Sequence, residues 1–156
     1  MTKEIERKFL VSGDFKKHTI KSYKIAQGYL STVPERTVRI RIRDHQGFIT
    51  IKGISNVSGT TRFEWEKEIS VKEAENLLLL CEPAIIEKIR HIVPANDHLY
   101  FEVDEFFGEN KGLLIAEIEL QNENTKFIKP SWLGEEVTGQ LKYYNAMLAK
   151  EPFSEW

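Results

Sequence analysis

Charged residues occupy every second position in several segments of this chain, and that alternation restricts the fold more than any other feature. The longest runs are Glu4–Phe9, Val38–Arg43 and Arg62–Ile69, and shorter ones follow at 87–90, 101–104 and 116–120. Because side chains alternate sides along a β-strand, each segment places its charges on one face and mostly apolar residues on the other. The pattern predicts a sheet with one face dense in carboxylates, guanidiniums and ammoniums.

The strand signals favour a mainly antiparallel β fold with a few helices, in the α+β class. Eight strands are predicted at about 3–10, 22–31, 36–44, 47–53, 62–70, 85–92, 99–105 and 114–121. Turn residues separate most of them, as in Asp44–Gly47 and Gly108–Gly112. Eight short antiparallel strands favour a closed barrel or a sandwich.

Two helices are expected between and after the strands. Ser70–Glu73 fits a capping box, and the apolar spacing that follows it runs until Pro83. A second helix is predicted over 138–150, with Leu141, Tyr144 and Leu148 as packing residues and no chemical role. A short helical turn is expected near 14–17. With no repeat or linker, residues 1–156 are expected to form a single domain.

Composition excludes several classes of function. The net charge of −2 and the pI near 6.1 argue against a nucleic-acid partner. The single cysteine, Cys81, excludes an intrachain disulfide and a multi-cysteine zinc site. No apolar run approaches the roughly 20 residues of a membrane span, and the amino terminus does not resemble a secretory signal. The sequence therefore predicts a cytoplasmic protein without a membrane partner.

The alternation of side chains along a strand does not say which face of the strand is buried. An ordinary antiparallel sheet would put the apolar face inside and leave every charge in water. Against this, the charged face is almost without Thr, Ser, Gln and Asn, and it carries arginines whose forked groups suit phosphate. If the charges point inward, the apolar exterior must be covered by helices, loops or another subunit. On that basis a homodimer is expected, with Trp65 in the core or at the interface.

The motif Glu4-x-Glu6-x-Lys8, standing ahead of the other charged strands, resembles the CYTH superfamily, also called triphosphate tunnel metalloenzymes. Further matching segments are Gln27–Leu30, Val38–Arg41, Thr50–Gly53, Glu64–Glu68, Glu87–Arg90, Glu102–Asp104, Ala116–Glu119 and Trp132–Thr138. The resemblance implies an eight-stranded antiparallel β-barrel that forms a tunnel with its charged residues inside. It also implies a divalent metal and one of three activities: hydrolysis of inorganic triphosphate, hydrolysis of thiamine triphosphate, or cyclisation of ATP. The chain is most similar to the short bacterial branch, which is linked mostly with tripolyphosphate hydrolysis.

Within that family the charged residues take on roles. Phosphate oxygens are expected to be bound by Lys8, Arg39, Arg41, Lys52, Lys88 and Arg90. One or two Mg²⁺ or Mn²⁺ ions are expected on oxygen ligands from Glu4, Glu6, Asp104, Glu117 and Glu119. Lys8, Tyr29 and Glu66 are assigned to catalysis, in which a metal-activated water attacks a terminal phosphorus in line. The hydroxyl of Tyr29 is expected to meet Lys8 if the strand registers agree.

Other functions stay open at this point. A nucleoside triphosphatase or an adenylate cyclase of the class IV type needs a base pocket at a tunnel mouth, and no residues clearly make one. A thiamine triphosphatase needs an aromatic side chain at a mouth. A non-catalytic module that binds polyphosphate or nucleotide would keep the cations without productive metal chemistry.

Overall fold

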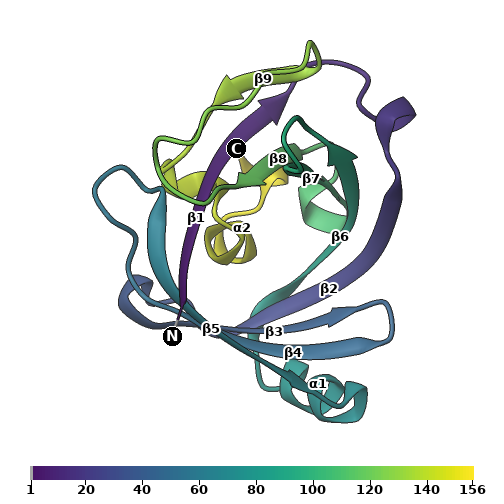
Figure 1. Cartoon of the computed structure of the whole chain (residues 1–156). Helices are drawn as coiled ribbons and strands as arrows, with labels where there is room; N and C mark the ends of the chain where they lie inside the picture. The colour runs from purple at the N-terminus through teal and green to yellow at the C-terminus, as the bar shows by residue number, and fades with distance from the viewer. Residues whose placement is uncertain (1) are drawn as a thin grey trace.

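The computed structural model describes residues 2–156 as a closed antiparallel barrel (Figure 1). Its strands are β1 (Thr2–Val11), β2 (Lys21–Ser31), β3 (Thr37–Arg43), β4 (Gln46–Lys52), β5 (Thr61–Ile69), β6 (Glu82–Pro94), β7 (Tyr100–Phe106), β8 (Leu114–Glu119) and β9 (Leu133–Glu136). The order is β5-β4-β3-β2-β6-β7-β8-β1-β9, and a further pairing of β5 with β1 closes the ring. Since β9 lies outside that ring, the barrel has eight strands. The predicted fold class is confirmed.

Strand β1 closes the barrel because its two halves pair with different neighbours. Its first residues pair with β5, in the register Glu4 opposite Arg62, and its later residues pair with β8, in the register Lys8 opposite Glu117. At its end it also pairs with β9, which the sequence did not predict. Strand β9 has only four residues and no period-two alternation, so the signal used for the other strands is missing there.

The helices differ from prediction in their extent. Helix α1 (Val71–Leu78) has the capping box on Ser70, as predicted, but ends early because β6 already begins at Glu82. The predicted helix over 138–150 is wrong in its first half: Gly139 has a left-handed φ of 78°, and only α2 (Asn145–Lys150) is α-helical. Single 3₁₀ turns occupy Lys16–His18, Pro34–Arg36, Gly108–Asn110, Leu141–Tyr143 and Phe153–Glu155. Within residues 2–156 no helix is long and apolar enough to cross a membrane.

One of the two hydrophobic clusters lies outside the barrel wall. On the outer faces of β1, β6, β7 and β8, Phe9, Val93, Phe101 and Ile118 are buried beneath the segments that follow β1 and β8. Trp132 covers this surface, with its ring centroid 5.1 Å from that of Phe101, and thereby holds the chain before β9. Loops and short elements thus provide the cover that an inward-facing charged surface requires.

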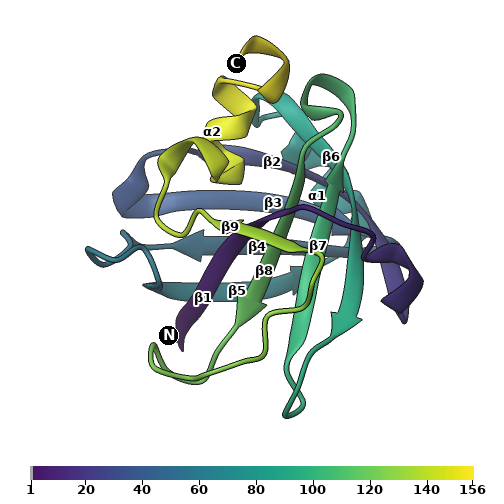
Figure 2. The same cartoon turned by 90° about the horizontal axis from the view of Figure 1, so that it is seen from above.

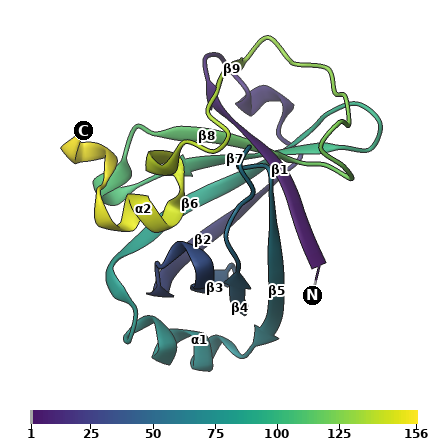
Figure 3. The same cartoon turned by 90° about the vertical axis from the view of Figure 1, so that its left-hand side faces the viewer.

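The other covers are helical. Helix α1 lies against the outer faces of β3 and β4 (Figures 1 and 3). Helix α2 packs on β6 and β2 near one end of the barrel (Figure 2), where Leu148 joins Ile86 and Phe106 in a second apolar cluster.

Part of the exterior stays uncovered. Ile51, Phe63 and Trp65, on β4 and β5, are 40%, 50% and 40% exposed. Trp65 is therefore not a core residue, and the homodimer expected from this apolar surface stays a prediction.

Candidate active site

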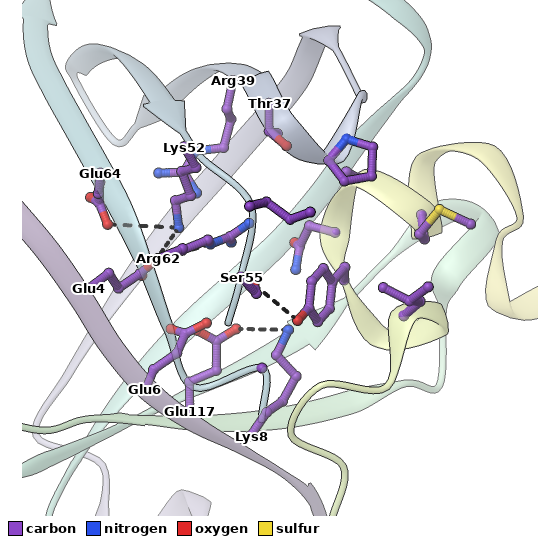
Figure 4. A pocket seen from close by; sticks show the side chains of 18 of the residues that line it. Glu4, Glu6, Lys8, Thr37, Arg39, Lys52, Ser55, Arg62, Glu64 and Glu117 are labelled. Atoms are coloured by element: carbon purple, nitrogen blue, oxygen red, sulfur yellow. Dashed lines mark hydrogen bonds and ion pairs between the residues drawn. The ribbon is translucent and has the colours of Figure 1, made fainter. Parts of the chain in front are cut away.

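The charged side chains point into the barrel, where a cavity of about 600 Å³ opens between the strands. Its wall carries all the residues assigned to metal, phosphate or catalysis except Asp104. Figure 4 labels several of the lining residues, among them Glu4, Glu6 and Lys8 from β1 and Lys52 from β4. The charged faces of the strands therefore line the inside of the barrel, and the alternative of an apolar interior is excluded.

The two signs of charge are sorted between the two halves of the barrel. Four neighbouring strands, β7-β8-β1-β5, supply every lining carboxylate that comes from a strand. The other four, β4-β3-β2-β6, supply no lining carboxylate, and three of them, β4, β3 and β6, supply lining cations. Lys8 and Arg62 are the two cations placed on the acidic half. The acidic residues are Glu4, Glu6, Glu64, Glu66, Glu102, Glu117 and Glu119, and the basic half carries Arg39, Arg41, Arg43, Lys52, Lys88 and Arg90.

On the acidic half, like charges face one another directly. Glu6 is opposite Glu119 across β1 and β8, and Glu102 is opposite Glu117 across β7 and β8. Burial, followed by the charges of Glu117 and Glu4, raises the pKa of Glu6 well above its ordinary value. Opposed carboxylates destabilise a sheet unless a proton or a cation lies between them.

This arrangement fits a divalent cation. No cluster of three or more Asp, Glu, His or Cys is placed to hold a metal by itself among residues 2–156. Mg²⁺ is commonly bound through only one or two carboxylates together with waters and substrate phosphates. Glu6 and Glu119, which face each other across β1 and β8, and the neighbouring Glu117 offer oxygen ligands of that kind.

A second charged group lies between β1, β4 and β5. Lys52 Nζ donates to Glu4 Oε2 at 2.8 Å and is 3.8 Å from Glu64 Oε2, and Arg62 Nε is 3.5 Å from the same Glu4 oxygen. Burial alone would raise the pKa of Glu4, but the charges of Lys52 and Arg62 outweigh it and hold that pKa well below its ordinary value. Glu4 is thus an ionised carboxylate that already has cationic partners.

Asp104 lies behind the cavity wall. Its carboxylate accepts from Lys88 Nζ at 2.7 Å and from Arg90 Nε and Nη2 at 2.8 and 2.9 Å. The side chains of Asp104 and Lys88 are each 1% exposed. Both oxygens of this predicted metal ligand are therefore occupied by two of the predicted phosphate-binding residues.

Arg39 and Arg41 are held by neighbouring polar side chains. Arg39 Nη2 donates to Thr50 Oγ1 at 3.1 Å and is 3.5 Å from Glu66 Oε2, which also accepts from Thr50 at 2.8 Å. Arg41 donates through Nε and Nη2 to Gln27 Oε1 at 3.0 and 2.9 Å. These contacts fix both guanidiniums while the cavity surface stays cationic.

Lys8 is approached by the segment before α2. Its Nζ donates to the carbonyl of Tyr143 at 3.3 Å and lies 4.0 Å from Glu117 Oε1. The centroid of the Tyr144 ring is 4.6 Å from Lys8 Nζ and 5.6 Å from the Arg62 guanidinium, so the ring makes a cation–π contact with each. Tyr144 therefore belongs to the site, and the prediction that it only packs is wrong.

Tyr29 lines the cavity, but no hydrogen bond joins it to Lys8 within the described residues. Its hydroxyl accepts from Gln27 Nε2 at 3.2 Å instead. Burial raises the pKa of Tyr29, so its hydroxyl stays protonated at neutral pH.

Sequence reasoning also missed polar residues that lack a charge. Gln27 and Asn145 are uncharged and so carry no period-two charge signal, and the full burial of Gln27 on β2 is a finding of the structure. Asn145, Ala146 and Met147 reach the cavity from α2. Their position depends on where the carboxy-terminal segment folds back, which no local pattern states.

The sequence pattern of the CYTH domain matches residues 2–151. The chain belongs to the CYTH domain family. It is 47% identical to an inorganic triphosphatase of Acetivibrio thermocellus over 98% of this chain and 97% of that protein. It is 37% identical to an inorganic triphosphatase of Nitrosomonas europaea over 94% and 96% of the two chains. The solved structure of the inorganic triphosphatase NE1496 superimposes with a TM-score of 0.67 at 34% identity, covering 93% of this chain and 96% of that one. The CYTH family resemblance seen in the sequence is confirmed.

Proposed function

We propose that this CYTH domain hydrolyses inorganic tripolyphosphate with the help of a divalent cation. The observation that supports this most strongly is the sorting of charge in the lumen, with cations on β4, β3 and β6 and carboxylates on β7, β8, β1 and β5. Tripolyphosphate is compact and carries about four to five negative charges near neutral pH, so a cationic wall binds it while a carboxylate wall retains its cation. Two relatives that match nearly the whole chain are inorganic triphosphatases.

The basic half binds the substrate in this proposal. Arg39, Arg41 and Arg90 bind phosphate oxygens through their forked groups, and Lys52 and Lys88 act as point charges. Phosphoryl transfer passes through a loose transition state, so positioning and charge stabilisation provide most of the catalysis. Asp104 is assigned to hold Lys88 and Arg90 in place.

The acidic half holds the cation. Glu6, Glu117 and Glu119 are the proposed ligands. Glu4 ranks after them, because Lys52 and Arg62 already pair with its carboxylate. When bound, Mg²⁺ or Mn²⁺ neutralises phosphate charge and lowers the pKa of a coordinated water. The assay below tests the choice between these ions, and titration of the purified protein with each ion tests whether one or two bind.

The predicted catalytic residues then take specific tasks. Lys8 lies on the acidic wall, 4.0 Å from Glu117 Oε1, and stabilises charge on the attacked phosphate. Tyr29 remains protonated and donates its hydroxyl hydrogen to a phosphate oxygen. Glu66 holds Arg39 through the 3.5 Å ion pair and so orients it.

A triphosphate ester is the second candidate, and one feature favours it. The wall of the cavity also includes an apolar group from three loops and α2: Pro34, Ile54, Val57, Leu141 and Met147. A nucleoside or thiamine moiety attached to the triphosphate would contact this group, whereas inorganic tripolyphosphate has no apolar part to bind there.

One assay tests these functions together. The purified protein is offered tripolyphosphate, ATP and thiamine triphosphate with Mg²⁺ or Mn²⁺, and phosphate, pyrophosphate and cyclic AMP are measured. Tripolyphosphate turnover at the highest kcat/KM supports the proposal. Cyclic AMP as the main product, or binding of all three without turnover, contradicts it. Gel filtration of the same sample tests the expected homodimer, and cell fractionation tests the predicted cytoplasmic location.

A further inference from the structure

Two cations fix the direction of two neutral amides that lie between them. Arginine and lysine side chains only donate hydrogen bonds, so any amide atom that contacts them must be an oxygen. Arg41 Nε and Nη2 donate to Gln27 Oε1, which turns the Gln27 nitrogen the other way, and that nitrogen donates to Asn145 Oδ1 at 3.0 Å. Lys88 Nζ donates to the same Asn145 oxygen at 2.8 Å. The chain Arg41–Gln27–Asn145–Lys88 therefore has a single arrangement of donors and acceptors.

This chain of hydrogen bonds joins four separate elements. Arg41 is on β3, Gln27 on β2 and Lys88 on β6, while Asn145 is the first residue of α2. Gln27 is fully buried, and a buried amide is costly unless its polar atoms are paired. Its oxygen and nitrogen are both paired here, because the nitrogen also donates to Tyr29. The contact is thus part of the construction of the site and not an incidental surface bond.

Each cation keeps hydrogen-bonding capacity for a ligand. Lys88 Nζ uses two of its donors on Asp104 and Asn145, and Arg41 uses Nε and Nη2 on Gln27. Ammonium groups have three donors and guanidiniums five, so both retain hydrogen atoms for a phosphate oxygen. The amides therefore orient these groups without consuming them.

Asn145 also retains a donor of its own. Its oxygen accepts from both Gln27 and Lys88, and its Nδ2 makes no hydrogen bond to any residue within 2–156. The residue lines the cavity. We propose that Asn145 is a further residue of the triphosphate site, which positions Lys88 directly and Arg41 through Gln27, and donates its own amide hydrogen to a phosphate oxygen. The substrate grip is then complete only when α2 is in place. This assignment rests on the proposed function.

The test begins with Asn145→Ala, assayed for phosphate release from tripolyphosphate. Hydrogen bonds to charged groups are among the stronger ones, so KM is expected to rise about 10- to 100-fold with kcat changed much less. Asn145→Asp keeps an acceptor at the same place but adds a negative charge, so its KM also rises. The two variants differ in a second readout, the exchange of the Arg41 Nε proton with water, observed by NMR of the arginine side chains. That proton is protected in the parent protein and in Asn145→Asp, and exchanges faster in Asn145→Ala.

Leu148→Ala is the matched control, since it removes a buried apolar side chain of α2 while Asn145 and its amide contacts stay in place. It is expected to lower the melting temperature while KM and the Arg41 signal stay close to those of the parent. A normal KM in Asn145→Ala, or an equal rise in KM in Leu148→Ala, overturns the assignment. So does an unchanged Arg41 signal in Asn145→Ala. If the parent protein fails to hydrolyse tripolyphosphate, the proposed function fails instead, and the Arg41 signal still tests the positioning.

Discussion

Replacing Asp104 by asparagine tests whether this residue is the counter-ion of two buried cations. The variant keeps the shape of the side chain but removes its charge, and leaves Lys88 and Arg90 facing a neutral amide at 2.7–2.9 Å. Removing one partner of a buried ion pair typically costs about 3–5 kcal/mol, because the remaining charge stays desolvated. For a chain of this size each kcal/mol lowers the melting temperature by about 2–4 °C, so the expected fall is roughly 6–20 °C.

Urea and thermal unfolding, followed by circular dichroism, measure this cost. The double variant Asp104→Asn with Lys88→Met removes one of the stranded cations and is expected to recover part of the lost stability. High salt is expected to change the cost little, since buried charges are weakly screened. A loss below about 1 kcal/mol, or no recovery in the double variant, would refute the counter-ion assignment. If Asp104 were instead a metal ligand, the main effect would be on metal dependence and not on the metal-free fold.

Three further outcomes follow from the same geometry. Glu6→Gln removes one of two facing carboxylates, so the metal-free protein should unfold at the same or a higher temperature. Metal-dependent turnover should fall about a hundredfold. Lower stability with unchanged turnover would show that Glu6 has a structural role instead. Arg41→Ala should raise KM about 10- to 100-fold in the phosphate-release assay, and normal kinetics would exclude it from the substrate grip. Glu123, whose pKa is lowered by hydrogen bonds from Thr60, Asn56 and Thr61, holds the loop between β4 and β5 as a carboxylate. Since a lowered pKa means that this contact is present at neutral pH and lost as the pH falls through it, the protection factors of the loop amides, which are corrected for the intrinsic pH dependence of exchange, should fall in acid. Glu123→Ala should show these lower protection factors already at neutral pH, with no further fall in acid.

The sequence was sufficient for the eight strands of the barrel and for the charged residues of its wall. Period-two alternation is a local property, so runs such as Val38–Arg43 identified both the strand and the residues that share a face. The same rule misses β9, which pairs with β1 at only two positions. The helix expected from residue 138 fails for a different reason, because Gly139 has a left-handed backbone conformation. Neutral residues such as Asn145 carry no alternation of charge and were missed for that reason.

The alternation by itself determined that acidic and basic side chains lie on one surface of one sheet. Only the tertiary structure decided that this surface is the inside, because β1 pairs with both β5 and β8 and the segments around Phe15 and Trp132 cover the apolar exterior. It also decided that Asp104 lies behind the wall and that α2 reaches the cavity. Local sequence fixes which side chains share a face, whereas enclosure and chain return depend on contacts between residues far apart in the sequence, which no local period encodes.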